Sequence, residues 1–404
     1  MTESYLGIEI NEEMTVVHET VRRFSEEVIR PLGIELDKMH TPEQVIAADS
    51  PLWQGLEQYK ELGLVGQQGA YGPDLSPAQR ALLHCMVMEE MCAGDVGLNI
   101  TYSLFNCAAM TARNFGNEDA ALFFDDRDEI CCLAITEPNH GTDQVAFTEP
   151  GHRNANIGID CKVRRDGDDY IINGQKSSWV STGTIAGAAI LFASYEGSDK
   201  GAADGAVFVM PLDLPGISKG KPLDKIGQRS LNQGEIFFDN VRVPGKFMMM
   251  DGPDVYPMIW EFTLRDANIA MGQMFVGVAR AAYEHALQYS KERVQGGVPI
   301  IQHQNVKSRL YGMFLKVEMA RSHVRQVAIS NATQEGGVPF QYATGAKLAA
   351  TQAAFDVAND AIQSFGGYGL CREYPVEKLF RDARASLIED GENSMLAIMA
   401  ASRL

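Results

Sequence analysis

Residues 363–393 have the sequence QSFGGYGLCREYPVEKLFRDARASLIEDGEN, and the interpretation of the whole chain starts from them. The pair Gly366-Gly367 suits the end of a helix, because a residue without a Cβ can enter the left-handed region or let a second backbone approach closely. Further on, Asp390 precedes Gly391 within a short acidic run. Such a run is by itself typical of a solvated turn. Its meaning therefore depends on the segments that come before it.

The composition indicates a globular chain that does not bind nucleic acid. The 404 residues are 45% hydrophobic, which is enough to build two or three packed units. A formal net charge of −18 disfavours binding to a phosphate backbone. The chain starts without a basic and apolar leader and has no run of about 18 apolar residues. We therefore expect no membrane span and a cytoplasmic location.

The cysteines and histidines indicate neither disulfides nor a metal site. The seven cysteines are scattered and include no CxxC pair, which is typical of reduced thiols in a core. The eight histidines show no spacing of the kind that binds a metal. We predict that the protein holds no metal.

The first part of the chain has helical periodicity. Apolar residues at helical spacing predict a helix from Glu12 to Ile29, which Pro31 ends. A second helix is predicted from Ser76, a good N-cap residue that is followed by proline, to Ala93.

Between residues 128 and 244 the pattern changes to short runs rich in β-branched and aromatic residues. Strands are predicted at 170–172, 188–193, 205–210 and 235–239, and Asn173-Gly174 predicts a hairpin turn. Long alanine-rich segments at 263–291, 304–332 and 341–365 then predict a helical bundle. The predicted fold is α+β, with an N-terminal helical domain (1–127), a middle β-barrel or sandwich domain (128–245) and a C-terminal four-helix bundle (246–404).

Two segments of the middle part combine glycines with hydroxyl residues. Residues 133–143 have the sequence LAITEPNHGTD, and residues 174–183 have the sequence GQKSSWVSTG. Small residues and free N–H groups let a backbone approach a planar ring and a phosphate. The indole of Trp179 offers a rigid apolar wall, and the hydroxyl of Ser181 can donate a hydrogen bond. The alternative for this pair is a core tryptophan followed by a strand serine.

In their order and spacing, these two segments, residues 223–244 and the C-terminal stretch resemble the acyl-CoA dehydrogenases, which are flavoenzymes that desaturate acyl thioesters. The resemblance extends along essentially the whole chain. It implies the same order of three domains, bound FAD, an acyl-CoA substrate and an electron-transfer flavoprotein as the partner that takes the electrons. It also implies a homotetramer, or a dimer, in which subunits share their FAD sites.

The resemblance also implies which residues contact FAD. The guanidinium of Arg293 corresponds to one that reaches the FAD pyrophosphate of a neighbouring subunit, and a fixed fork of donors suits a diphosphate. At position 392 relatives commonly carry threonine, so Glu392 is a departure. The implied FAD-binding residues are Leu133, Ile135, Thr136, Gly141, Thr142, Trp179, Ser181, Arg293, Gln304, Gln363, Gly366, Gly367 and Glu392.

By the same resemblance, Asp390 stands where many relatives carry a glutamate base, and Thr142, Asp390 and Gly391 bind the substrate. The backbone N–H of residue 390 and a flavin ribityl hydroxyl are the implied donors to the thioester carbonyl. An aspartate retracts the carboxylate by roughly 1.5 Å, which matters for proton transfer. Either a bulky or branched acyl group sits closer, or another acid is the base. The alternatives are Asp95, Asp266 and Glu392.

The family's second base position falls on Ala267, and Asn268 follows where many relatives carry arginine. We therefore expect FAD-dependent α,β-dehydrogenation of an acyl-CoA to the 2-enoyl-CoA with Asp390 as base. Three alternatives stay open: a dehydrogenase of an alicyclic or unsaturated acyl-CoA with another base, an acyl-CoA oxidase or flavin monooxygenase, and a non-catalytic homologue that binds acyl-CoA.

Overall fold

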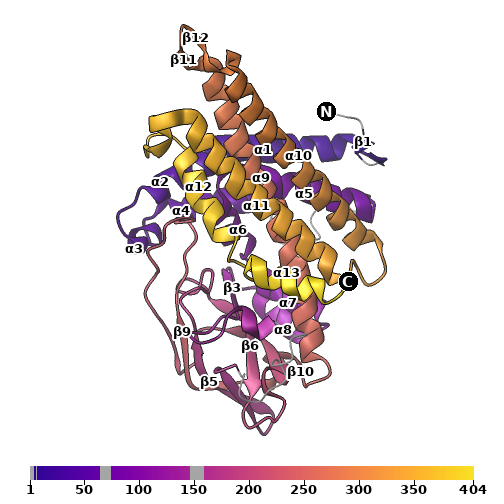
Figure 1. Ribbon diagram of the computed structural model, residues 1–404. Coiled ribbons are helices and arrows are strands. Elements are labelled where there is room, and N and C mark those ends of the chain that lie inside the picture. The colour runs from indigo at the N-terminus through magenta and orange to yellow at the C-terminus, as the bar shows by residue number, and fades with distance from the viewer. Residues whose placement is uncertain (1–3, 6, 64–73, 146–158) are drawn as a thin grey trace.

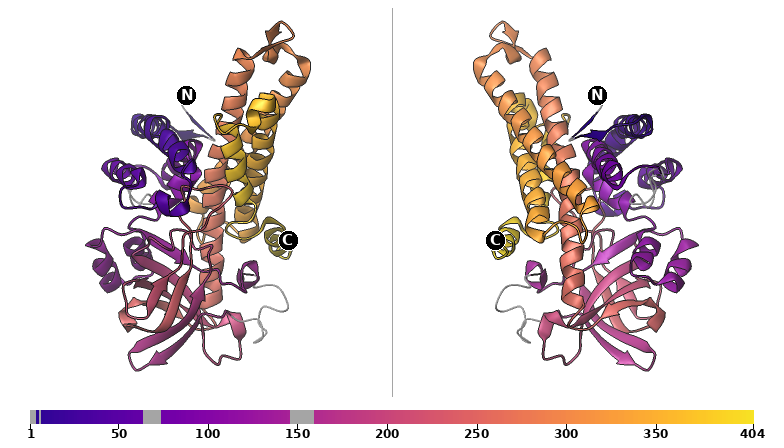
Figure 2. Two further views of the ribbon diagram at one scale, coloured as in Figure 1. Left: turned by 90° about the vertical axis from the view of Figure 1, so that its left-hand side faces the viewer. Right: turned by 90° about the vertical axis from the view of Figure 1, so that its right-hand side faces the viewer.

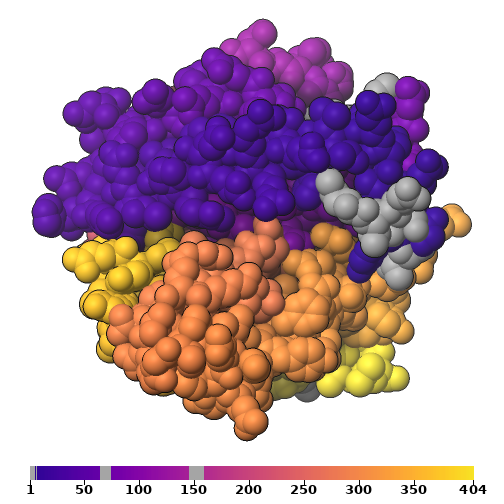
Figure 3. Space-filling view, turned by 90° about the horizontal axis from the view of Figure 1, so that it is seen from above, coloured from indigo at the N-terminus to yellow at the C-terminus, as the bar shows by residue number. Residues whose placement is uncertain are grey.

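The computed structural model describes residues 4–5, 7–63, 74–145 and 159–404. Helices, a central sheet and a second set of helices follow one another along the chain, as predicted (Figure 1). Figure 2 shows the sheet below the helical bundle and the N-terminal helices packed along one side of that bundle. The same two helical layers are seen from above in Figure 3. Within the described ranges, no helix is long and apolar enough to cross a membrane.

The N-terminal helices begin at capping residues. The side chain of Asn11 accepts a hydrogen bond from the backbone N–H of Met14 and starts α1 (Glu12–Phe24). The hydroxyl of Ser76 accepts from the N–H of Gln79 and starts α5 (Pro77–Gly94), close to the predicted bounds. The other elements here are β1 (Ser4–Tyr5), β2 (Ile8–Glu9), α2 (Arg30–Asp37), α3 (Pro42–Val45), α4 (Pro51–Glu61), α6 (Val96–Ser103), α7 (Cys107–Asn114) and α8 (Glu118–Asp125).

The prediction that Pro31 ends the first helix was wrong. The helical backbone continues from α1 through a π-helical turn (Ser25–Ile29) into α2, and Pro31 lies in the first turn of α2. In the π turn, the N–H of Arg30 donates to the carbonyl of Ser25, five residues earlier. The missing N–H of Pro31 therefore falls where the regular hydrogen-bond ladder is already interrupted.

The central region is an eight-stranded sheet in the order β10-β7-β6-β4-β5-β9-β8, with β3 also paired to β6. The parallel pairing of β3 with β6 places the loop that follows Ala134 beside the middle of the sheet. The last strand lies beyond residue 245, the predicted domain boundary. The strands are β3 (Cys131–Ala134), β4 (Lys162–Asp166), β5 (Asp169–Lys176), β6 (Ala188–Tyr195), β7 (Gly205–Pro211), β8 (Ile217–Lys219), β9 (Ile236–Val243) and β10 (Met248–Asp251).

The predicted hairpin at Asn173-Gly174 was wrong, because both residues lie inside β5. The turn between β4 and β5 contains Gly167 instead, with φ of +68°. The pairing of β5 with β9 shifts register between Ile172 and Gly174, and a Cβ at position 174 would lie 2.6 Å from the Cα of Cys161. The glycine therefore permits a close approach of two backbones at a bulge.

The C-terminal region is a bundle of long helices, and the predicted fold class is confirmed. Buried alanines at 343, 346, 350 and 354 let α11 pack closely within the bundle. A hairpin of β11 (Val294–Gln295) and β12 (Val298–Pro299) joins α9 to α10 and projects at the top of Figure 1. The helices are α9 (Tyr256–Glu292), α10 (Gln304–Thr333), α11 (Phe340–Phe365), α12 (Val376–Ser386) and α13 (Asn393–Ala401).

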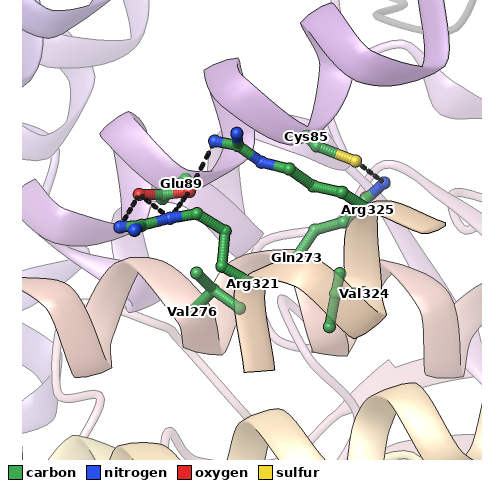
Figure 4. A pocket seen from close by; sticks show the side chains of 7 residues that line it. All are labelled: Cys85, Glu89, Gln273, Val276, Arg321, Val324 and Arg325. Atoms are coloured by element: carbon green, nitrogen blue, oxygen red, sulfur yellow. Dashed lines mark hydrogen bonds and ion pairs between the residues drawn. The ribbon is translucent and has the colours of Figure 1, made fainter. Parts of the chain in front are cut away.

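Buried ion pairs fix the N-terminal helices to this bundle. The carboxylate of Glu89 on α5 accepts hydrogen bonds from Arg321 (2.8 Å) and Arg325 (3.0 Å) on α10 (Figure 4). Arg280 on α9 lies 3.0 Å from the same carboxylate. Burial acts to raise the pKa of Glu89, but the charges of the three arginines prevail and hold it at about 2. Glu89 is therefore ionised at neutral pH, and its ion pairs hold α5 against α9 and α10.

Candidate active site

Asp390 lies in a tight turn between α12 and α13. Its φ is +49°, in the left-handed region that aspartate enters more readily than most residues with a side chain. Gly391 follows with φ of +97°, and a Cβ there would lie 2.8 Å from the side chain of Leu396. The N–H of Asn393 donates to the carbonyl of Leu387 (3.1 Å) and closes the turn.

Side chains from two helices and one loop hold the backbone of this turn. The amide of Asn268 on α9 donates to the carbonyl of Asp390 (3.2 Å), and the ammonium of Lys347 on α11 donates to the carbonyl of Gly391 (2.5 Å). From the middle region, the hydroxyl oxygen of Thr142 accepts a hydrogen bond from the N–H of Glu392 (3.2 Å). Segments far apart in sequence thus meet at residues 390–392.

Charge and burial act in opposite directions on Asp390. Asp390 is exposed at the surface of the single chain, although many protein atoms lie around its carboxylate. This crowding raises the pKa of Asp390, and the positive charge of Lys347 opposes the rise. Burial lowers the pKa of Lys347 to about 8, although Asp390 and Glu389 attract its charge. An ionised carboxylate with a raised pKa is a stronger base than a free one, which suits proton abstraction.

The other two acids of the run have different partners. The carboxylate of Glu389 accepts a hydrogen bond from the side-chain amide of Gln228 (3.0 Å). Burial raises the pKa of Glu389 to about 7, although Gln228 and the charge of Lys225 lower it. Glu392 caps α13: its carboxylate accepts from the N–H of Met395 (3.0 Å), and hydrogen bonds from backbone N–H groups lower its pKa. Of the three acids, Glu389 and Glu392 thus have hydrogen-bond partners of their own, and Asp390 is the candidate base.

The loop after β3 is tied to the end of β5. The N–H of Ser177 donates to the carbonyl of Thr136 (2.8 Å). The buried carboxylate of Glu137 accepts from the ammonium of Lys176 (2.6 Å) and from the N–H of Cys161 (3.1 Å). These contacts fix the loop that carries Thr142. Leu133 in β3 and Ile135 in the loop are half-buried, and Gly141 is exposed. No sequence pattern had marked Glu137 or Lys176 as anchors.

Trp179 and Ser181 follow β5, just after Ser177, which is bonded to this loop. The indole of Trp179 is 61% exposed, which is unusual for so large an apolar side chain. The side-chain amide of Gln233 donates to the carbonyl of Trp179 (3.2 Å) and to the hydroxyl oxygen of Ser181 (3.3 Å). An exposed indole next to a fixed hydroxyl leaves an apolar face available to a flat ligand. Gln233 carried no sequence signal.

A second group of predicted FAD-binding residues lies at the other end of the bundle. Asn268 and Arg293 are 25 residues apart along α9 and its C-cap, which is about 37 Å at 1.5 Å per residue. The guanidinium of Arg293 lies over the ring of Tyr368, 5.5 Å from its centroid. Within one chain, this group therefore lies far from the turn between α12 and α13 (Figure 1). The group consists of Arg293, Gln304, Gln363, Gly366 and Gly367.

The alternative acids Asp95 and Asp266 lie outside the turn. Asp95 is buried, and its carboxylate accepts hydrogen bonds from the hydroxyl of Ser230 (2.6 Å) and the ammonium of Lys378 (2.5 Å). Asp266 is exposed on α9 and accepts from Arg265 (3.1 Å). Both oxygens of Asp95 are engaged, because Oδ1 accepts from Ser230 and from the N–H of Leu98, and Oδ2 accepts from Lys378.

The chain thus has a helical region, a sheet and a bundle in order, and the sheet region and the bundle meet at the turn that carries Asp390. Three domain models of one family match the chain in order: acyl-CoA dehydrogenase N-terminal domain (residues 11–121), middle domain (132–241) and C-terminal domain (259–404). The chain belongs to the acyl-CoA dehydrogenase family, as the sequence resemblance predicted.

Known relatives match over nearly the full length. The short-chain specific acyl-CoA dehydrogenase of Rattus norvegicus is 28% identical over 407 residues, covering 99% of this chain and 92% of the relative. Probable acyl-CoA dehydrogenase YngJ of Bacillus subtilis (strain 168) is 28% identical over 411 residues, covering 99% and 100%. The structure of butyryl-CoA dehydrogenase from Megasphaera elsdenii superposes with a TM-score of 0.83 at 26% identity, covering 98% and 99%.

Proposed function

We propose that this enzyme dehydrogenates the bond between Cα and Cβ of an acyl-CoA and that Asp390 is the base. The observation that carries the proposal is the placement of Asp390. Its carboxylate has a raised pKa and stands at the corner of a turn that Asn268, Lys347 and Thr142 hold from three sides. Preorganisation of this kind is what a general base needs.

Residues of the middle region fit FAD, which the family implies. The exposed indole of Trp179 can cover one face of a flat ring, and the fixed hydroxyl of Ser181 can donate to its edge. The hydroxyl oxygen of Thr142 accepts from Glu392, so its own O–H is left to donate to a ligand. Ile135, Thr136 and Gly141 belong to the same loop, and Leu133 lies in β3 just before it. When bound, FAD supplies the acceptor for the hydride.

Asp390 contributes to the reaction in two ways. Its carboxylate takes the proton from Cα, while its backbone N–H donates to the thioester carbonyl and stabilises the negative charge that develops there. The hydrogen bond from Asn268 to the carbonyl of residue 390 fixes the orientation of the residue. Gly391 permits the turn itself, because its φ is +97° and a Cβ there would collide with Leu396.

The second group of residues supports an assembly in which subunits share FAD sites. Because Arg293 is about 37 Å along α9 from Asn268, its guanidinium would bind the diphosphate of an FAD held mainly by another subunit. Gln304, Gln363, Gly366 and Gly367 would contact the same cofactor. This arrangement requires a homotetramer or a dimer. Glu392 caps α13 and would not replace the donor that a threonine offers.

Structural features favour Asp390 over the other acids. Asp95 is fully engaged in a buried network, Asp266 is paired with Arg265 on α9 outside the turn, and Glu392 is used as a helix cap. A non-catalytic homologue would not need a carboxylate with a raised pKa at this turn. The reduced flavin would pass its electrons to an electron-transfer flavoprotein. In the alternatives, an acyl-CoA oxidase or a flavin monooxygenase, oxygen would accept them instead.

An anaerobic titration tests the proposed activity. The flavin-loaded protein is mixed with straight-chain, branched and alicyclic acyl-CoAs, and with free CoA as the control. At least one thioester should abolish the absorbance of oxidised flavin and give one 2-enoyl-CoA per flavin, whereas free CoA should not. Flavin that is reoxidised faster by oxygen than by an electron-transfer flavoprotein would support an oxidase instead. A flavin that no acyl-CoA reduces would refute the proposal.

A further inference from the structure

A fully buried lysine lies directly beneath the Asp390 turn. Lys347 on α11 has 0% of its surface exposed, and so have Thr344 and Thr351. The spacing 344, 347, 351 places all three on one face of the helix. This polar stripe runs along a helix whose other buried residues are mainly alanines. Burying a lysine costs free energy unless its charge is compensated, so its partners decide what it does.

The stripe holds the turn at two points. The ammonium of Lys347 donates to the carbonyl of Gly391 (2.5 Å). Four residues along α11, the hydroxyl oxygen of Thr351 accepts from the side-chain amide of Asn393 (3.1 Å) and its O–H donates to the carbonyl of Lys347 (2.8 Å). The turn at 390–393 is therefore fastened to α11 at Gly391 and at Asn393. A shift of Lys347 would move the residue next to Asp390.

The charges around Lys347 single out Asp390. Three carboxylates of the turn attract the ammonium: Asp390, Glu389 and Glu392. Glu389 also faces Lys225 and Gln228, and Glu392 is bonded to N–H groups of α13. For Asp390, by contrast, Lys347 is the one charge that offsets its desolvation. Lys347 therefore affects the ionisation of Asp390 more than it affects the ionisation of Glu389 or Glu392.

We propose that Lys347 is a positioning residue for Asp390, which fixes the turn through Gly391 and keeps the Asp390 carboxylate ionised near neutral pH. The proposal rests on the proposed function in one respect, that Asp390 is the base. Because the positive charge lowers the pKa of Asp390, its removal raises that pKa and shrinks the ionised fraction at any given pH. Lys347 has a pKa of about 8 and is mostly protonated at neutral pH and below. The effect therefore appears on the acid limb of a pH profile.

Three substitutions separate charge from hydrogen bonding. Lys347→Met removes both, Lys347→Gln keeps a donor without a charge, and Lys347→Arg keeps the charge. The rate of flavin reduction by acyl-CoA is measured against pH. In Lys347→Met and Lys347→Gln the acid limb should move to higher pH by about one unit, whereas Lys347→Arg should stay near the wild type. Lys307→Gln, on an exposed lysine of α10, is the matched control and should not move the limb.

A second measurement does not depend on activity. A carbodiimide with glycine amide labels protonated carboxyls, and peptide mass spectrometry gives the pH midpoint of labelling at Asp390. The midpoint should rise in the Met and Gln variants and stay unchanged in Lys307→Gln. If wild type does not reduce its flavin but the midpoint moves, the proposed function fails and the role of Lys347 stands. If folded variants shift neither midpoint nor acid limb, or if Lys347→Arg shifts both as far as Lys347→Met, the proposal is wrong. Should the Met variant not fold, the Gln and Arg variants decide.

Discussion

Replacing Asp390 by asparagine (Asp390→Asn) is expected to slow the reduction of bound flavin by acyl-CoA about 10²–10⁴-fold. Asparagine has nearly the same size and tolerates the φ of +49° found here, so the turn should persist. The backbone N–H that would bind the thioester carbonyl also stays in place. What is lost is the carboxylate that accepts the proton. Anaerobic stopped-flow measurement of flavin absorbance gives the rate.

The matched control is Asp266→Asn, the same chemical change at an exposed acid of α9. Its rate should stay within a few-fold of wild type, and both variants should keep their flavin and their circular dichroism. An Asp390→Asn variant that reduces flavin at the wild-type rate would contradict the assignment. The base would then have to be sought at Asp95, Asp266 or Glu392, and a slowed Asp266→Asn variant would identify Asp266.

Replacing Lys378 by methionine (Lys378→Met) is expected to lower the free energy of unfolding by about 3–5 kcal/mol. The ammonium of Lys378 on α12 donates to the buried carboxylates of Asp95 (2.5 Å) and Asp382 (2.6 Å). Burial acts to lower the pKa of Lys378, but the two carboxylates prevail and raise it, so it stays charged. Without it, two buried carboxylates are left close together. Denaturant unfolding measures the change.

Two further variants show whether the loss comes from uncompensated charge. Lys307→Met removes an exposed lysine of α10 and should change stability by less than about 0.5 kcal/mol. Adding Asp382→Asn to Lys378→Met removes one of the stranded charges and should recover part of the loss. A Lys378→Met variant as stable as wild type would mean that Lys378 does not hold α12 against the N-terminal helices.

Elements with local signals were predicted from sequence. The start of α5 depends on Ser76 and the residues just after it, and the predicted helix 341–365 agrees with α11 (Phe340–Phe365) because its periodicity is regular over many turns. The error at Asn173-Gly174 has a non-local cause. Gly174 is needed because Cys161 approaches it in space, and this contact cannot be read from the dipeptide. The π turn before Pro31 likewise contacts a distant segment, since the hydroxyl of Ser25 donates to the carbonyl of Glu90 (2.6 Å).

The site was predicted in pieces. Thr142 and Asp390 were named separately, and the structure adds the hydrogen bond between Glu392 and Thr142 that joins their loops. Lys347 escaped notice because a lysine in an alanine-rich helix is usually a surface residue, and only the packing of α11 under the turn shows that it is buried. Gln233 was overlooked for a similar reason, since its partners lie more than fifty residues away in the sequence.

The most direct test of the central claim follows the hydrogens that leave the substrate. An acyl-CoA that reduces the flavin is prepared with deuterium at both positions of Cα and both positions of Cβ, and it is converted anaerobically in a single turnover. The account predicts a 2-enoyl-CoA that keeps one deuterium on each of these carbons, because Asp390 takes one from Cα and the hydride leaves Cβ. An oxidised product that keeps all four deuterons would contradict it.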